Sequence, residues 1–165
     1  MDHPRKIANG EPLPVRKHPS TNSVHENGFR PIILFVTVCT EGRASILANP
    51  VMAARIVAAW GVADKWAVGR YVIMPDHVHF FCAPTTHPPY DLQKWVTYWK
   101  RMLAQTMGHD VKLWQNGCWD TQMRTGEQYE TKWEYMRYNP VRKGLADKAD
   151  EWPYQGVVHD LQWVD

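Results

Sequence analysis

The feature that most constrains the fold is a pair of apolar segments separated by only two residues. Segment 67–74 is rich in β-branched and aromatic side chains, Pro75 and Asp76 follow it, and segment 77–82 is again apolar. A Pro-Asp pair is typical of a turn, and two strands joined by so short a link must run antiparallel. The sequence therefore predicts a β-hairpin in the middle of the chain.

The rest of the chain alternates between strand and helix patterns. Pro50 suits a first helical position and Asp91 a helix N-cap, while Pro140 disfavours helical geometry at the residue before it. The order is strand, helix, hairpin, helix, strand, with one further helix, which predicts a ferredoxin-like α+β fold: an antiparallel sheet with helices packed on it. The expected elements are strands 31–39, 67–74, 77–82 and one within 111–123, and helices 50–66, 91–108 and 127–139.

Length and composition predict one domain. The chain has 165 residues, 44% of them hydrophobic, which suffices for one core. Residues 1–30 are polar and lack periodicity, so we expect a flexible N-terminal arm, a folded domain over 31–156 and a C-terminal tail over 157–165. The formal net charge of +2 excludes a strongly basic coat, so any affinity for nucleic acid must come from local patches.

The cysteines and apolar runs bear on the compartment. Cys39, Cys82 and Cys118 are far apart and form no CxxC pair, which argues against a disulfide framework or a zinc ribbon. The N-terminus lacks a signal-peptide core, and no apolar run approaches the roughly 20 residues that a membrane span needs. We expect a soluble cytoplasmic protein with no membrane partner.

Two histidines at the start of the second hairpin strand form a candidate metal site. His77 and His79 are two residues apart, so on a strand both point to the same face, while Val78 and Phe80 point to the other. Two neutral imidazoles suit Zn, Mn, Co or Ni. The alternative is a pair of polar residues on a solvated strand face. The metal-site interpretation is favoured because the pair opens a strand beside a turn, at the edge of the working face of the sheet.

The last predicted helix offers a second pair. Tyr135 and Asn139 are four residues apart, so on a helix they lie one turn apart on the same side. The phenol of one residue and the amide oxygen of the other can then both reach the same point in space. The alternative is ordinary: Tyr135 as a core aromatic and Asn139 as a C-terminal cap before Pro140.

Both stretches resemble motifs of one protein family. YVIMPDHVHFF (71–81) resembles the metal-binding strand of HUH endonucleases, in which U is a hydrophobic residue, here Val78. YMRYNPVRKGL (135–145) resembles the tyrosine motif of the REP-associated tyrosine transposases, members of the single-tyrosine HUH transposase superfamily (insertion-sequence 200-like transposases). The resemblance covers about residues 30–156 and implies a ferredoxin-like fold whose added C-terminal helix carries the tyrosine.

The resemblance implies a reaction and its residues. His77, His79 and Asn139 would bind a divalent metal ion, Mg²⁺ or Mn²⁺, and Tyr135 would be the nucleophile. The implied enzyme is a metal-dependent transposase and endonuclease that nicks and rejoins single-stranded or hairpin DNA through a 5′-phosphotyrosine. Its implied partners are palindromic extragenic repeats, and the protein would be a monomer or a homodimer.

Thr121 departs from the family pattern, and Tyr138 is a second candidate for the nucleophile. The family usually has His where Thr121 stands, which puts a polar or basic role at that position in doubt. Tyr138 is a second tyrosine near the first, but it does not share the side of the helix that carries Tyr135 and Asn139, and we interpret it as a packing residue.

The DNA contacts are predicted from basic and aromatic side chains. Helix 91–108 carries them interleaved, a pattern that can follow phosphates and stack unpaired bases. An amphipathic helix that buries its tryptophans beside a solvated basic edge explains the same pattern. Family position adds two arginines, so the candidates are Lys94, Trp99, Lys100, Arg101, Arg124 and Arg142.

Two other functions fit parts of the sequence. A domesticated DNA-binding protein without transposition activity would keep the fold, although it would not need His77, His79, Tyr135 and Asn139 together. A small zinc hydrolase would use the histidine pair, but no carboxylate is evidently placed to act as its base or further ligand.

Overall fold

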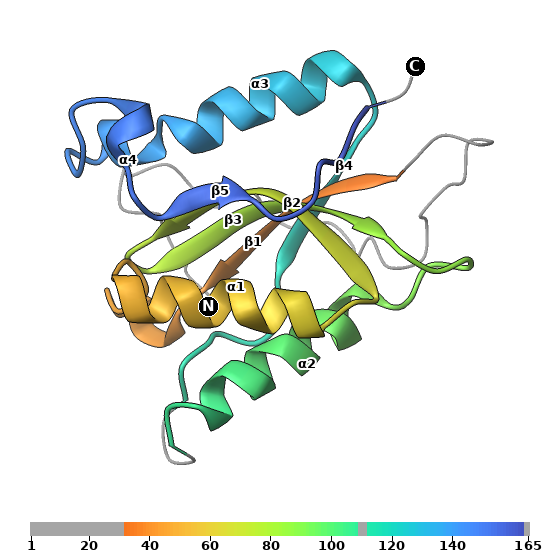
Figure 1. The fold of residues 1–165 in the computed structure, drawn as a ribbon, viewed down its shortest axis with the longest axis horizontal. Coiled ribbons are helices and arrows are strands. Elements are labelled where there is room, and N and C mark those ends of the chain that lie inside the picture. Colours follow the sequence, from red (N-terminus) through yellow and green to blue (C-terminus); the bar gives the residue numbers. More distant parts are fainter. Residues whose placement is uncertain (1–31, 109–111, 164–165) are drawn as a thin grey trace, which may run out of the picture.

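The computed structural model describes residues 32–108 and 112–163; the expected arm over 1–30 lies outside these ranges. Its sheet has five antiparallel strands in the order β4-β1-β3-β2-β5. The strands are β1 (Ile33–Cys39), β2 (Trp66–Met74), β3 (His77–Pro84), β4 (Trp119–Met123) and β5 (Gln155–Val157), and the main helices are α1 (Pro50–Val62), α2 (Leu92–Gln105) and α3 (Gly126–Arg137). The first four strands and two helices follow the ferredoxin-like order, so the predicted fold class is confirmed (Figure 1).

The predicted hairpin is confirmed, and it lies at the centre of the sheet. β2 and β3 pair from Met74 and His77 at the turn to Trp66 and Pro84 at the far end. β3 lies between β1 and β2, and the histidine pair opens this central strand beside the turn, as expected. The turn itself is anchored: the backbone N–H and the hydroxyl of Thr40 both donate to the Asp76 carbonyl at 3.0 Å.

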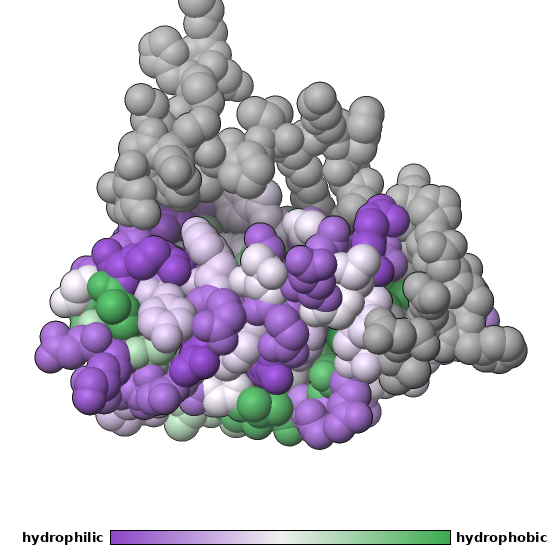
Figure 2. Space-filling model, turned by 90° about the horizontal axis from the view of Figure 1, so that it is seen from above, coloured by the Kyte–Doolittle hydropathy of each residue, from purple (hydrophilic) through white to green (hydrophobic). Residues whose placement is uncertain are grey.

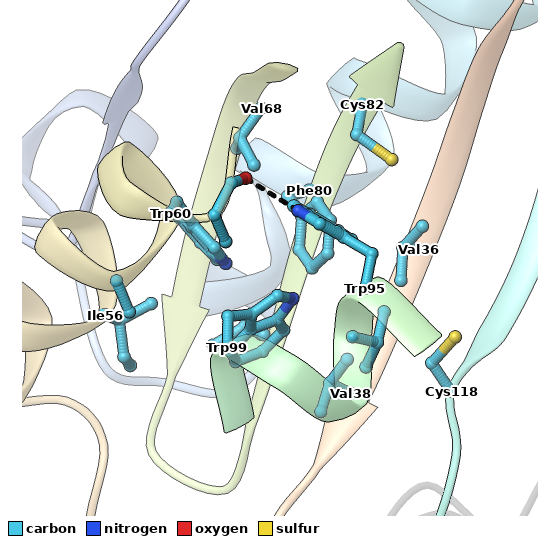
Figure 3. Close-up of a cluster of buried hydrophobic side chains, with 14 of the residues drawn as sticks. Val36, Val38, Ile56, Trp60, Val68, Phe80, Cys82, Trp95, Trp99 and Cys118 are labelled. Atoms are coloured by element: carbon cyan, nitrogen blue, oxygen red, sulfur yellow. Dashed lines mark hydrogen bonds between the residues drawn. The ribbon is translucent and has the colours of Figure 1, made fainter. Parts of the chain in front are cut away.

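One face of the sheet is covered by α1 and α2. Trp60 from α1 and Trp95 and Trp99 from α2 gather around Phe80 of β3 (Figure 3). The indole N–H of Trp95 donates to the carbonyl of Ala63 at 2.7 Å, which ties the start of α2 to the end of α1. Helix α1 ends at Val62, earlier than expected, because Trp66 already belongs to β2.

The opposite face is covered by α3, on the other side of the sheet from α1 and α2 (Figure 1). Tyr129 and Met136 of α3 join a second core with Ile33, Phe35 and Phe81. Thr125 caps the helix by accepting from the backbone N–H of Gln128 at 3.1 Å. Seen from the α3 side, the described surface is largely hydrophilic, with small apolar patches (Figure 2).

The third helix ends sooner than the sequence suggests. α3 stops at Arg137, and a separate short helix α4 (Asn139–Arg142) begins at the asparagine. Proline is tolerated in a first helical turn, where its missing N–H would be unpaired anyway. Pro140 therefore opens α4, and the prediction of one helix through residue 139 is wrong.

The segment after α4 returns to the sheet. The indole N–H of Trp152 donates to the carbonyl of Ile73 at 3.0 Å, which holds this segment against β2. β5 then pairs with β2, and Leu161 and Trp163 pack against the second core. The predicted domain boundary at residue 156 therefore falls within β5, and packed residues continue beyond it.

Candidate functional site

His77 and His79 lie on the face of β3 that α3 covers. Val78 and Phe80 point the other way, into the core with α1 and α2. The two histidines are 6% and 8% exposed, so the expectation of a solvated strand face is wrong. Both are buried because the second core and the start of α4 close over this part of the sheet.

Three polar side chains converge at this point. The Nε2 atoms of His77 and His79 are 3.1 Å apart. The side-chain amide of Asn139, at the start of α4, lies 3.3 Å from the His77 Nε2 and is itself buried. The structure brings these three residues together, and their role as metal ligands stays a prediction. The convergence comes about through the α3–α4 junction and not through one continuous helix.

The outer nitrogen of each imidazole has its own partner. The Asp76 carboxylate lies 2.7 Å from the His77 Nδ1, and the Thr37 hydroxyl lies 2.8 Å from the His79 Nδ1. The other oxygen of Asp76 accepts from the Arg43 Nε at 2.9 Å. A carboxylate can only accept, so His77 carries its proton on Nδ1 and its Nε2 lone pair faces inward.

Burial controls the charge state of the cluster. Burial lowers the pKa of His77 despite the hydrogen bond and the charge of Asp76. The pKa of His79 falls well below its ordinary value, first through burial and then through the positive charges of His77, Lys132, Arg43 and Arg142. Burial alone would raise the pKa of Asp76, but His77 and Arg43 outweigh it and leave that pKa lowered. The imidazoles are therefore neutral near neutral pH, as metal ligands must be.

The donor set fits a divalent metal ion. Two nitrogen ligands of one ion, with bonds of about 2.0–2.1 Å, lie roughly 3 Å apart, which agrees with the 3.1 Å between the two Nε2 atoms. Within residues 32–108 and 112–163, no three His, Cys, Asp or Glu side chains form a metal-binding group. The third protein donor would therefore be the amide oxygen of Asn139, with the amide turned from the orientation seen here.

Tyr135 is a residue of α3, the helix on the histidine face of the sheet. It is 51% exposed, so the alternative of a core aromatic is wrong. The guanidinium carbon of Arg142 lies 4.2 Å from the centre of the Tyr135 ring, and the same side chain donates to the Tyr135 carbonyl at 2.5 Å. On the other side, the Lys132 ammonium lies 5.6 Å from the ring centre. Arg142 therefore lies beside Tyr135, and its predicted contact with DNA stays a prediction.

Two of the four predicted DNA contacts on α2 are corrected by the structure. Trp99 is fully buried and cannot stack on a base, and Lys100 is buried with its ammonium bonded to the carbonyls of Gln115 and Gly117. Lys94 and Arg101 are exposed, but α2 covers the face of the sheet opposite the histidine pair. The amphipathic alternative is therefore the correct description of α2.

The remaining positions are on the surface. Arg124 and Thr121 are exposed at β4. Tyr138 is 44% exposed and contacts the guanidinium of Arg137, so its interpretation as a packing residue is wrong.

Three residues beside the site were missed. Asp76 precedes His77 directly and Lys132 lies one helical turn before Tyr135, so sequence spacing could have indicated both. No sequence signal indicates Arg43, which reaches Asp76 from a turn where its backbone has a left-handed φ of 57°.

Two further findings concern the cysteines and the lengths of the helices. Cys39, Cys82 and Cys118 are buried and form no disulfide bond with one another. No helix in residues 32–108 or 112–163 has the length and apolar character needed to cross a bilayer.

Comparisons with known proteins agree with the motif resemblance. No protein-family model matches the chain. A REP-associated tyrosine transposase of Haemophilus influenzae is 22% identical over 104 residues, covering 54% of this chain and 58% of the relative. The REP-associated tyrosine transposase of Escherichia coli is 25% identical over 96 residues, covering 57% and 56%. The chain thus aligns with somewhat over half the length of each curated relative.

A solved structure shares the fold. It is a REP-associated tyrosine transposase bound to a REP hairpin, with a TM-score of 0.67, 19% sequence identity and 77% of each chain covered. The predicted resemblance to REP-associated tyrosine transposases is therefore confirmed in sequence and in fold.

Proposed function

We propose that this protein is a metal-dependent transposase and endonuclease that nicks and rejoins single-stranded or hairpin DNA through a 5′-phosphotyrosine on Tyr135. The observation that carries the proposal is the convergence of the His77 and His79 Nε2 atoms with the Asn139 amide, beneath a helix with an exposed tyrosine. The curated relatives are named REP-associated tyrosine transposases, which supports the transposase part of the proposal. The hairpin bound to the structural relative supports hairpin DNA as the partner.

The proposed cofactor is Mg²⁺ or Mn²⁺, held by His77, His79 and Asn139. Such an ion supplies Lewis-acid polarisation and orientation of the scissile phosphate. Asp76 and Thr37 hold the two imidazoles so that their Nε2 atoms face the same point. Neutral imidazoles leave these lone pairs free for binding near pH 7.

Tyr135 is the proposed nucleophile. Its hydroxyl oxygen forms a bond to phosphorus while the bond between phosphorus and the 3′ oxygen breaks, and that oxygen leaves as a 3′-OH after taking up a proton. Arg142 fixes the ring from one side and thereby limits the orientations of the phenol. The phosphotyrosine keeps the energy of the broken linkage, so a 3′-OH can rejoin the strand without a nucleotide cofactor.

The nearby cations support a phosphate substrate. Arg43, Lys132 and Arg142 all act electrostatically on His79, and Lys143 acts on His77. The overall charge of the chain is only +2, so this local positive field is what would attract a DNA backbone to the site.

The proposed compartment is the cytoplasm.

The test is adduct formation on a synthetic DNA hairpin with a single-stranded 5′ flank, in Mn²⁺. We expect the labelled strand to become attached to Tyr135 through its 5′ phosphate, with the other fragment ending in 3′-OH. Tyr135→Phe removes one oxygen, so it should keep the fold and DNA binding but form no adduct. Tyr138→Phe is the matched control and should be nearly silent.

Mass spectrometry distinguishes the alternatives. An adduct on Tyr138, or fragments with free 5′ phosphates and no adduct, contradicts the single-tyrosine mechanism. Hairpin binding without any nicking would favour the DNA-binding protein that has lost transposition activity.

A further inference from the structure

Lys132 lies directly beside the proposed nucleophile and has no carboxylate partner among the residues that the structure describes. It lies one helical turn before Tyr135 on α3, and its side chain is partly buried. Its ammonium nitrogen lies 5.0 Å from the centre of the Phe35 ring and 5.6 Å from that of Tyr135. No acidic side chain in the described ranges forms an ion pair with it, whereas the charge of Arg43 is matched by Asp76.

Lys132 lies close to a residue that contacts His79 as well as to Tyr135. The Phe35 ring beneath the ammonium stacks on the imidazole of His79, with centroids 5.2 Å apart. The charge of Lys132 also acts directly on His79. The ammonium therefore lies over the boundary between the proposed metal ligands and the proposed nucleophile, where a phosphate must sit for both to act on it.

The contacts of Lys132 leave its hydrogen-bonding capacity free. Two aromatic rings hold the ammonium by cation–π attraction, which restrains it without supplying hydrogen-bond acceptors of ordinary strength. A partly desolvated ammonium with unused N–H groups binds an anionic oxygen strongly. Arg142 differs, because its guanidinium already lies on the Tyr135 ring and donates to the Tyr135 carbonyl.

We propose that Lys132 is a further catalytic residue, whose ammonium donates to a non-bridging oxygen of the scissile phosphate. This inference rests on the proposed function. As Tyr135 attacks, negative charge on the phosphoryl oxygens is redistributed, and a cation held in place stabilises the transition state without having to reorganise. Lys132 thus acts on the phosphate oxygens, while Arg142 orients the ring of the nucleophile.

The first experiment compares three variants of the full chain. Single-turnover nicking of the hairpin with a 5′ single-stranded flank is measured in Mn²⁺. Lys132→Met should slow nicking by about 100- to 1000-fold, the effect typical of losing one electrostatic donor, while Lys132→Arg should restore most of the rate. The control is Lys65→Met. Lys65 is exposed and directly precedes β2, at the end of that strand far from the β2–β3 turn, so this variant should nick like the unmodified protein.

The second experiment separates catalysis from folding. A methylphosphonate at the scissile position removes the charge of one non-bridging oxygen. It should slow the unmodified protein strongly, and Lys132→Met much less relative to its own rate, because the lost contact is the same. Calorimetric titration with Mn²⁺ should show that Lys132→Met binds at least as tightly as the unmodified protein, since the substitution removes a positive charge near His79.

The outcomes distinguish a failure of the proposed role of Lys132 from a failure of the proposed function. If the unmodified protein forms the Tyr135 adduct and Lys132→Met nicks within threefold of it, the role of Lys132 is refuted and the proposed function stands. Equal methylphosphonate effects in both proteins also refute the role. If the unmodified protein forms no adduct, the proposed function fails and the role of Lys132 fails with it.

Discussion

Replacing Asp76 by Asn should weaken metal binding although Asp76 is not a proposed ligand. One carboxylate oxygen lies 2.7 Å from the His77 Nδ1 and the other 2.9 Å from the Arg43 Nε, so both oxygens accept a hydrogen bond. An amide has only one acceptor oxygen. Arg43 can only donate, so the amide oxygen of the variant turns to Arg43 and its NH₂ group faces His77.

The NH₂ group then selects the wrong tautomer of His77. It donates to Nδ1, which moves the imidazole proton to Nε2, the atom that faces His79. A protonated Nε2 cannot bind a metal until the ring changes tautomer and breaks the new hydrogen bond. Substitutions that disrupt such hydrogen bonds to metal-binding histidines typically lower metal affinity about 10- to 100-fold, which corresponds to about 1.4–2.7 kcal/mol of binding free energy.

The assay is calorimetric titration of the metal-free protein with Mn²⁺ at pH 7.5. The matched control is Asp64→Asn, the same change at an exposed aspartate beyond the end of α1, which should not alter the affinity. Thermal unfolding without metal shows whether each variant keeps its fold. If Asp76→Asn binds Mn²⁺ within about threefold of the unmodified protein while folded, the tautomer argument is refuted.

Further predictions concern the core, the histidines and the asparagine. Trp99→Ala should lower the free energy of unfolding, measured in urea, by about 3–5 kcal/mol, because Trp99 is 0% exposed. Tyr98→Ala is the control: Tyr98 is 50% exposed, so this change should alter the free energy by under about 1 kcal/mol. Similar losses in both variants would contradict the burial of Trp99 in the core. Burial lowers the pKa of His77 and His79 from 6.5, so below about pH 6.5 the unfolded chain takes up protons that the folded chain does not. The metal-free protein should therefore lose stability as the pH falls from 6.5 through the lowered folded pKa values, and pH-independent urea midpoints would refute this. Asn139→Ala should weaken Mn²⁺ binding less than His77→Ala, since water can replace an amide ligand; the reverse order would exclude Asn139 as a weak third ligand.

Local patterns in the sequence predicted most of the secondary structure. The Pro-Asp pair between two apolar segments predicted the hairpin, and Asp91 caps α2 by accepting from the Lys94 N–H at 2.8 Å, as expected. The two-residue period of a strand placed His77 and His79 on one face. These predictions hold because turns, caps and strand alternation depend on backbone geometry within a few residues.

The tertiary structure decided which surfaces meet. The helical period of α2 indicates an apolar face that includes Trp99, but it does not indicate which face of the sheet this helix covers, because that depends on long-range packing. Nor does the two-residue period of a strand reveal that β3 is central and that its two histidines are buried and not on a solvated face.

The network around the site also depends on the fold. Arg43 and Asp76 are 33 residues apart in the sequence, and Asn139 and His77 are 62 apart. The sequence alone determined which residues could bind a metal or attack a phosphate, since that follows from their side-chain chemistry. Only the packing of α3 and α4 on the sheet brought them together, because long-range contacts follow from the burial of whole apolar faces and not from local spacing.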